Sequence, residues 1–276
     1  MATKRVLAVH DLCSFGRCSL TAAIPVISAM GFQVCPFPTA LFSNNLTYGE
    51  FTFQDFTDGM PGFLDRWEAF GFTYDAIYSG FLGDAKQVAV VADTIRRFAK
   101  PDTLVVVDPA MGDDGKLYPV FTPDFVRAMR TLVGKATVIT PNFTEACFLL
   151  NRTIEEKAPS AETLRAVCED LVELGAPKVV ITSVPAAGNA LKVASFDSTT
   201  GEFAERTTPR VPFATCGTGD LFTSVLTGAL LDGSTLAQAA GRAMNFVSFA
   251  MEYTYREGTD PREGVVVEPC LKHLFN

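Results

Sequence analysis

The chain has 276 residues, of which 48% are hydrophobic and 20% are charged, and this balance is typical of a folded protein with a substantial core. Its formal net charge of −8 argues against a general affinity for nucleic acid, whose phosphates bind basic surfaces. The seven cysteines lack zinc-site spacing, and neither a signal peptide nor an apolar run that could cross a bilayer is found, so we expect a soluble, cytoplasmic protein.

Strands and helices are predicted to alternate along the chain. Short apolar runs predict strands at 6–9, 32–37, 76–78, 104–107, 137–139 and 179–181. Apolar residues at helical spacing predict helices at 19–30, 58–70, 85–98, after 142, and at 161–174, 217–232 and 234–255. The runs 191–196 and 202–208 predict an antiparallel hairpin. This order predicts one α/β domain over 1–276, with a doubly wound, mostly parallel sheet, helices on both faces and an antiparallel edge.

Polar side chains follow several of the predicted strands. They are Asp11, Asp108, Thr140, Asn142 and Thr182. In open parallel sheets, ligands bind beyond the carboxyl ends of the strands, and these ends meet at one edge. The placement of five polar residues at this edge therefore predicts a single functional site there.

A glycine-rich loop at 214–219 runs into one of the last predicted helices. Gly217 and Gly219 let the chain turn sharply, and the unpaired amides at the start of a helix can hold a phosphate. Asp220 could take a proton from a hydroxyl beside this anion site. An acid in the first turn also simply complements the helix dipole, so the loop alone does not decide the function. The chain contains neither a P-loop motif nor a dinucleotide-binding Gly-x-Gly-x-x-Gly after the first strand.

Six segments match the motifs of a known family in the same order. They are Phe42-Ser43-Asn44 with Tyr48-Gly49, Ser79-Gly80-Phe81-Leu82-Gly83, Asp108-Pro109 with Met111-Gly112-Asp113, Thr140-Pro141-Asn142 with Glu145, Ile181-Thr182-Ser183, and Gly217-Thr218-Gly219-Asp220-Leu221-Phe222. Over nearly its whole length the chain resembles the pyridoxal kinases of the ribokinase-like superfamily. The last segment is shared widely in that superfamily, whereas the Phe-Ser-Asn and Ser-Gly-Phe-Leu-Gly segments point to its vitamin B6 branch.

The resemblance implies a ribokinase-like fold and a homodimeric enzyme that uses ATP and Mg²⁺, with K⁺ or Na⁺ as a further candidate, to phosphorylate the hydroxymethyl group of pyridoxal or a related B6 vitamer. Catalysis would depend on Asp220 as general base and on the amides of Gly217, Thr218 and Gly219 as the anion hole. ATP would bind at Asp108, Asn142, Glu145, Thr182, Ser183 and Thr218. The vitamer would contact Asp11, Ser43, Thr47, Phe81 and Asp220. The metal ions would be held by Asp113, Glu145, Asp108 and Thr140.

Three positions depart from the family pattern. Asp11 stands near the usual serine, and its carboxylate could pair with a protonated pyridine nitrogen or an aminomethyl group. If so, vitamer selectivity should change in Asp11→Asn. Thr47 lies one place later than the family threonine, which leaves open which hydroxyl contacts the substrate. Phe81 replaces a frequent tyrosine, so it could stack on a ring without donating a hydrogen bond.

Two other functions stay open on the sequence alone. The first is a kinase for hydroxymethylpyrimidine or another small alcohol, because the glycine motif and Asp220 do not separate these substrates. The second is a non-catalytic protein that binds B6 or a nucleotide. Asp220 and the acidic metal set argue against the second, because a binding protein gains nothing from a base beside its anion site.

Overall fold

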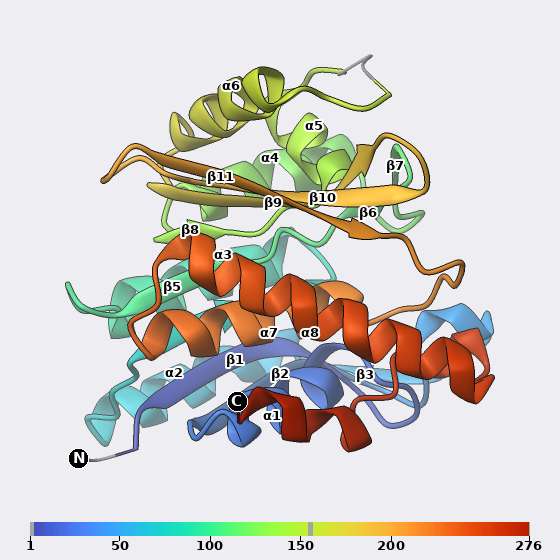
Figure 1. The fold of residues 1–276 in the computed structure, drawn as a ribbon. Helices are drawn as coiled ribbons and strands as arrows, with labels where there is room; N and C mark the ends of the chain where they lie inside the picture. Colours follow the sequence, from blue (N-terminus) through green and yellow to red (C-terminus); the bar gives the residue numbers. More distant parts are fainter. Residues whose placement is uncertain (1–2, 154–156, 276) are drawn as a thin grey trace.

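The computed structural model describes residues 3–153 and 157–275 and contains a nine-stranded sheet and a separate two-stranded hairpin (Figure 1). The strands are β1 (Arg5–Cys13), β2 (Gln33–Phe42), β3 (Phe53–Asp55), β4 (Ala76–Ser79), β5 (Leu104–Val107), β6 (Gly112–Asp113), β7 (Lys116–Leu117), β8 (Val138–Ile139), β9 (Lys178–Ala186), β10 (Ala190–Asp197) and β11 (Glu202–Pro209). The order in the large sheet is β11-β10-β9-β8-β5-β4-β1-β2-β3. The pairs from β9 to β2 are parallel, whereas β3, β10 and β11 pair antiparallel.

Helices cover both faces of this sheet. They are α1 (Ser19–Ala29), α2 (Met60–Ala69), α3 (Ala85–Phe98), α4 (Pro123–Val133), α5 (Phe143–Leu150), α6 (Ala161–Val172), α7 (Thr218–Leu231) and α8 (Leu236–Glu257). Short 3₁₀ turns are η1 (Leu46–Tyr48), η2 (Thr57–Gly59), η3 (Pro261–Glu263) and η4 (Glu268–Leu274). Figure 1 shows α7 and α8 side by side in front of the sheet.

Two hydrophobic cores lie on the opposite faces of the sheet, because successive side chains of a strand point to opposite sides. In β5, Val105 and Val107 enter the core beneath α2 to α6, and Val106 enters the core beneath α1, α7, α8 and η4. This double burial explains why the strand is an uninterrupted β-branched run. The predicted doubly wound, mostly parallel sheet with an antiparallel edge hairpin is confirmed. None of the described helices is both long enough and apolar enough to cross a membrane.

The first strand is longer than its apolar run predicts. The polar residues after Val9 were expected to lie in a loop, but β1 continues to Cys13 because it still pairs with the end of β2. The register shifts between His10 and Leu12, which places Asp11 at an irregularity of the ladder. Such irregularities redirect side chains and are common beside functional sites.

The second strand runs farther than the predicted 32–37 and continues through two prolines. The amide of Gln33 donates to the carbonyl of Lys4 on the β1 side (2.9 Å), and amides of alternate residues in a strand point to opposite sides. Pro36 and Pro38 therefore place their nitrogens on the side away from β1, where no ladder hydrogen bond is lost. The short strand β3 pairs only with 40–42, beyond these prolines.

Residues 112–133 contain elements that were not predicted. The acidic loop after β5 closes into the β6–β7 hairpin, and α4 follows it. The buried residues of α4 are Phe125, Val126, Met129, Leu132 and Val133. Their spacing is that of one helical face, and Pro123 at the start is a common first helical residue. The pattern for this helix was therefore present in the sequence.

Candidate active site

The start of α7 forms an anion-binding turn with a carboxylate in it. Gly217 caps the helix, and the first bond inside it runs from the amide of Leu221 to the carbonyl of Gly217 (3.0 Å). The amides of 218–220 precede that bond and lie at the positive end of the helix dipole, where they can hold a phosphoryl group. The side chain of Asp220 is 16% exposed, so a small molecule can reach it.

Gly217 is required by both its backbone conformation and its surroundings. Its φ is +86°, in the left-handed region, and a Cβ there would lie 2.1 Å from the carbonyl oxygen of Arg17. Gly219 differs, since a Cβ would lie 3.6 Å from the nearest atom, Oδ2 of Asp108. The first glycine therefore fixes the turn, and the second places the helix start close to a neighbouring acid.

The carboxylate of Asp220 is held on one side only. Its Oδ2 accepts a hydrogen bond from the amide of Ser19 (2.7 Å), and its Oδ1 lies 3.8 Å from Nδ1 of His10. Burial lowers the pKa of His10 to about 3, so the imidazole is neutral and this contact is not an ion pair. Burial raises the pKa of Asp220 to about 6. Asp220 is therefore a base of near-neutral pKa whose Oδ1 accepts no hydrogen bond from the described residues.

A second pair of buried acids lies beside this turn. Asp108 follows β5, and its Oδ2 accepts a hydrogen bond from Oγ1 of Thr223 on α7 (3.3 Å). The hydroxyl of Thr223 also lies 3.0 Å from that of Thr140, which brings Thr140 to the same place. Burial, followed by repulsion from Glu145 and Asp220, raises the pKa of Asp108 well above its usual value. The acids of this cluster are Asp108, Glu145 and Asp220. In the described residues, none of them forms a hydrogen bond or an ion pair with a charged lysine or arginine side chain.

Glu145 and Asn142 hold the loop after β5 against α5. Glu145 accepts hydrogen bonds from the amides of Met111 (3.0 Å) and Asn142 (2.8 Å), and burial raises its pKa to about 8. Asn142 accepts from the amide of Glu145 (2.9 Å) and donates to the carbonyl of Gly112 (2.7 Å). These two residues form a capping box at the start of α5. The family resemblance predicted only nucleotide and metal contacts for them.

The oxygen ligands of this region suit Mg²⁺. Asp108, Glu145 and Thr140 offer only oxygen atoms, and the raised pKa values of the two acids show that a nearby cation would be favourable. In 3–153 and 157–275, no three acidic, histidine or cysteine side chains converge to bind a metal by themselves. The residues therefore fit a Mg²⁺ ion whose other ligands are waters and phosphate oxygens, as is usual for this ion.

Asp11 is joined to the Asp220 turn through one residue. The residue is 5% exposed, and Oδ1 accepts from the hydroxyl of Ser19 (2.6 Å) while Oδ2 accepts from the thiol of Cys13 (3.3 Å). Burial raises the pKa of Asp11. Because Ser19 also donates to Asp220, the predicted vitamer contact and the predicted base lie on either side of the same serine.

The other predicted vitamer contacts have structural partners of their own. Ser43 accepts from the amide of Thr52 (2.9 Å), which closes the β2–β3 turn. The hydroxyl of Thr47 bonds to Asn45 and to the carbonyl of Arg262. Phe81 is half-buried, with its ring 5.5 Å from that of Phe121. No hydrogen bond in the described part of the chain joins these three side chains to Asp220.

The remaining predicted nucleotide and metal contacts lie farther along the same edge. Thr182 lies in β9 beside Asn142, and its amide donates to the carbonyl of Pro141 (3.0 Å). Ser183 follows with a φ of +55° and an exposed side chain. Asp113 is an exposed residue of β6 whose carboxylate accepts from the amide of Asp114 (2.8 Å). The structure thus brings Thr182 to Asn142, and it places Asp113 near enough to Glu145 for its charge to help raise the pKa of that acid.

Two residues that contact the site were not predicted. Thr223 bonds to Asp108, and it lies three residues after Asp220, a spacing that puts both on one helical face. That spacing could have revealed it. Ser19 contacts Asp220 only because α1 packs against α7, and nothing in the local sequence indicates this contact.

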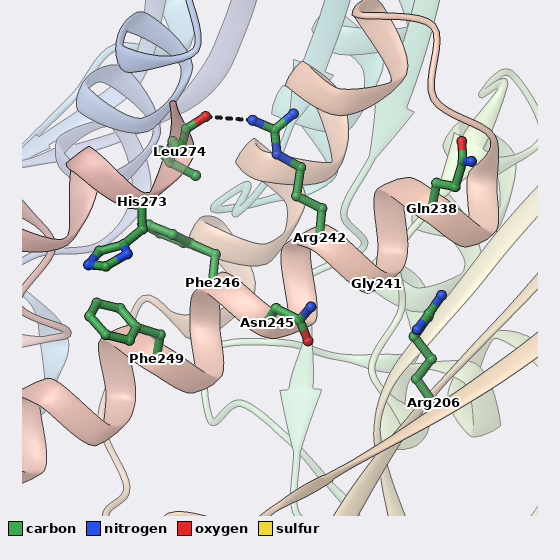
Figure 2. A pocket seen from close by; sticks show the side chains of 9 residues that line it. All are labelled: Arg206, Gln238, Gly241, Arg242, Asn245, Phe246, Phe249, His273 and Leu274. Atoms are coloured by element: carbon green, nitrogen blue, oxygen red, sulfur yellow. Dashed lines mark hydrogen bonds between the residues drawn. The ribbon is translucent and has the colours of Figure 1, made fainter. Parts of the chain in front are cut away.

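A separate hollow of about 490 Å³ lies on α8, away from Asp220. Figure 2 shows Arg206 of β11 on one side, the side chains of α8 along its floor, and His273 and Leu274 of η4 on the other side. Arg242 donates to the carbonyl of Leu274 across it (2.5 Å). None of the site residues described above lines this hollow, so it belongs to a different part of the surface.

The site combines a carboxylate base, the helix amides beside it and a pair of buried acids, all at the carboxyl edge of an α/β sheet. This combination defines the class of small-molecule kinases. Comparison with known proteins agrees with this class. A family model described as phosphomethylpyrimidine kinase matches residues 20–264, and the chain belongs to this family.

Individual relatives confirm the resemblance to pyridoxal kinases. A pyridoxal kinase of Deinococcus radiodurans is 30% identical over 285 residues, which cover 99% of this chain and 95% of the relative. A Bacteroides thetaiotaomicron structure with pyridoxal, of a protein described as a phosphomethylpyrimidine kinase, is 41% identical, with a TM-score of 0.95 and coverage of 100% and 96%. The pyridoxal kinase of Lactobacillus plantarum is 30% identical, with a TM-score of 0.90 and coverage of 99% and 97%.

Proposed function

We propose that this protein transfers a phosphoryl group from ATP to the hydroxymethyl group of pyridoxal or a closely related B6 vitamer. The observation that carries the proposal is Asp220, a reachable carboxylate of near-neutral pKa in the amide-lined first turn of α7. The relatives support the substrate, because two of them are named pyridoxal kinases and a third was solved with pyridoxal.

In the proposed reaction, Oδ1 of Asp220 takes the proton of the alcohol while the alcohol oxygen attacks the γ-phosphorus of ATP, and ADP leaves. The amides of Gly217, Thr218 and Gly219, together with that of Asp220, stabilise the charge on the transferred group. Phosphoryl transfer depends mainly on such positioning and charge stabilisation. On the nucleotide side, the proposed contacts are Asp108, Asn142, Glu145, Thr182, Ser183 and Thr218. Asn142 and Glu145 follow β8, whereas Thr182 and Ser183 lie within β9.

Asp108 and Glu145 are proposed to hold Mg²⁺, with Asp113 acting through water and with Thr140 near a K⁺ or Na⁺ ion. The support is the pair of buried acids described above, whose pKa values are raised. When bound, Mg²⁺ would neutralise charge on the phosphates of ATP. We also propose that residues 1–276 form a single kinase domain acting as a cytoplasmic homodimer. The nine-stranded sheet supports the single domain, and the family resemblance supports the dimer.

A coupled assay with ATP and Mg²⁺ tests the substrate, using pyridoxal, pyridoxine, pyridoxamine and hydroxymethylpyrimidine as acceptors. We expect the highest kcat/KM with one of the B6 vitamers. The matching family is named after a related pyrimidine, phosphomethylpyrimidine, so hydroxymethylpyrimidine is the second candidate. A higher kcat/KM with it would replace the proposed substrate. Binding of a vitamer without turnover would overturn the kinase proposal and favour a non-catalytic binding protein.

The activity should depend on pH through Asp220. Burial raises its pKa to about 6, and a general base must be ionised to work. Activity is therefore kept above that pKa, and kcat/KM should fall about tenfold per pH unit below about pH 6. Titration of His10 cannot cause this decrease in kcat/KM, because the pKa of His10 is about 3. A profile of kcat/KM against pH that stays flat down to about pH 5 would contradict the assignment of the base.

A further inference from the structure

Ser19, the first residue of α1, has a backbone conformation that residues with a side chain rarely adopt. Its φ is +51°, and the residue is only 6% exposed. A left-handed conformation is unfavourable for such a residue and persists only where the surrounding structure fixes it. The contacts of Ser19 therefore indicate what this conformation achieves.

Ser19 donates to both acids of the substrate side of the site. Its amide donates to Oδ2 of Asp220 (2.7 Å), and its hydroxyl donates to Oδ1 of Asp11 (2.6 Å). Within the described residues, the amide of Ser19 is the one hydrogen-bond donor to the carboxylate of Asp220, because His10 lies 3.8 Å away. The left-handed turn thus directs the amide to one acid while the side chain binds the other.

The two acids would repel one another without such a bridge. Both are largely buried, and the charge of Asp11 is one of the causes that raise the pKa of Asp220. A donor placed on each carboxylate by the same residue fixes their separation and leaves Oδ1 of Asp220 without a hydrogen bond. That free oxygen is the one available to accept a proton.

We propose that Ser19 is a positioning residue for the phosphoryl transfer. Its amide holds Oδ2 of Asp220 so that Oδ1 faces the acceptor alcohol, and its hydroxyl holds Asp11 where it helps to select the B6 vitamer. The inference rests on the proposed function. It predicts that the hydroxyl of Ser19 affects vitamer binding through Asp11, while the amide, which every substitution except proline retains, continues to hold the base.

The test is a double-mutant cycle of Ser19→Ala and Asp11→Asn, with KM and kcat measured for pyridoxal, pyridoxine, pyridoxamine and ATP. In Ser19→Ala we expect the KM of the preferred vitamer to rise about tenfold, as for a lost hydrogen bond to a charged group, with kcat falling by less than about threefold. The KM of ATP should change far less than that of the vitamer. In the Asp11→Asn background, Ser19→Ala should have little further effect, because the two groups act as one unit.

Two variants separate positioning from general damage. Ser19→Gly also lacks the hydroxyl, so it should show the same KM change, but it should have a higher Tm than Ser19→Ala because glycine suits the positive φ. Asn151→Ala alters another left-handed residue with a φ of +51°, at the end of α5, and should lower the Tm without changing the KM of the vitamer.

The outcomes distinguish this inference from the proposed function. An active parent enzyme whose Ser19→Ala variant keeps its KM for every vitamer would overturn the inference alone. The inference would also be overturned if the effects of Ser19→Ala and Asp11→Asn were additive, or if the KM of ATP rose as much as that of the vitamer. Either result would assign Ser19 a purely structural role. A parent without activity on any vitamer would overturn the proposed function and the inference with it.

Discussion

Asp220→Asn is expected to lower kcat by about 10²- to 10⁴-fold, the usual cost of losing a positioned general base. The substitution keeps the size of the side chain and an oxygen that can still accept from the amide of Ser19, so the fold should survive. KM values for ATP and vitamer should change much less than kcat, because the lost step is proton removal rather than binding. The measurement is steady-state kinetics on purified variants with matched circular dichroism spectra.

Asp84→Asn is the matched control for this prediction. Asp84 caps α3, where its carboxylate accepts from the amides of Lys86 and Gln87 (2.9 Å each). Asparagine is also a good capping residue, so this variant should retain stability and activity. If Asp220 served only to complement its helix, the two variants would behave alike. Near-parental kcat in Asp220→Asn would exclude it as the base.

Gly217→Ala is expected to destabilise the protein by more than about 3 kcal/mol and to remove most of the activity. Two effects combine, since alanine is unfavourable at a φ of +86° and its Cβ would lie 2.1 Å from the carbonyl oxygen of Arg17. Neither the loop before α1 nor the start of α7 can move without shifting the amides that would hold the phosphoryl group. Urea unfolding and the coupled assay would measure the two losses.

Gly233→Ala separates the two effects. Gly233 follows α7 with a φ of +89°, but no atom lies within 4 Å of the Cβ that would be added. This variant should lose only the conformational part, about 1 kcal/mol, and keep its kcat. Equal losses of stability in both variants would show that the contact with Arg17 is unimportant.

The sequence predicted the parts of the fold that follow from local patterns. The run Leu104–Val107 matches β5 from end to end, and the spacing of apolar residues gave α3 with both of its ends. The glycine loop was also correctly placed at the start of a helix. Gly217, which caps this helix, has a left-handed backbone that glycine adopts readily. These features depend on the residues themselves and hardly on distant contacts.

Features that depend on packing between distant segments could not be predicted in this way. The extension of β1 through Asp11 depends on pairing with β2, and the contact of Ser19 with Asp220 depends on the packing of α1 against α7. Glu145 shows a mixed case, since its position in the sequence suggested a metal ligand, whereas its contacts also make it a helix cap. The helix α4 is different, because its amphipathic pattern is local and predictable although it was not predicted.

The prolines of β2 affect how molecules of this protein meet one another at high concentration. No further strand among the described residues pairs with β2 over 33–39, so its outer edge could otherwise recruit an extended segment from another molecule. Pro36 and Pro38 remove two donors from that edge and thereby prevent a continuous ladder from forming across it. Pro36→Val and Pro38→Val together would be expected to favour intermolecular β aggregation.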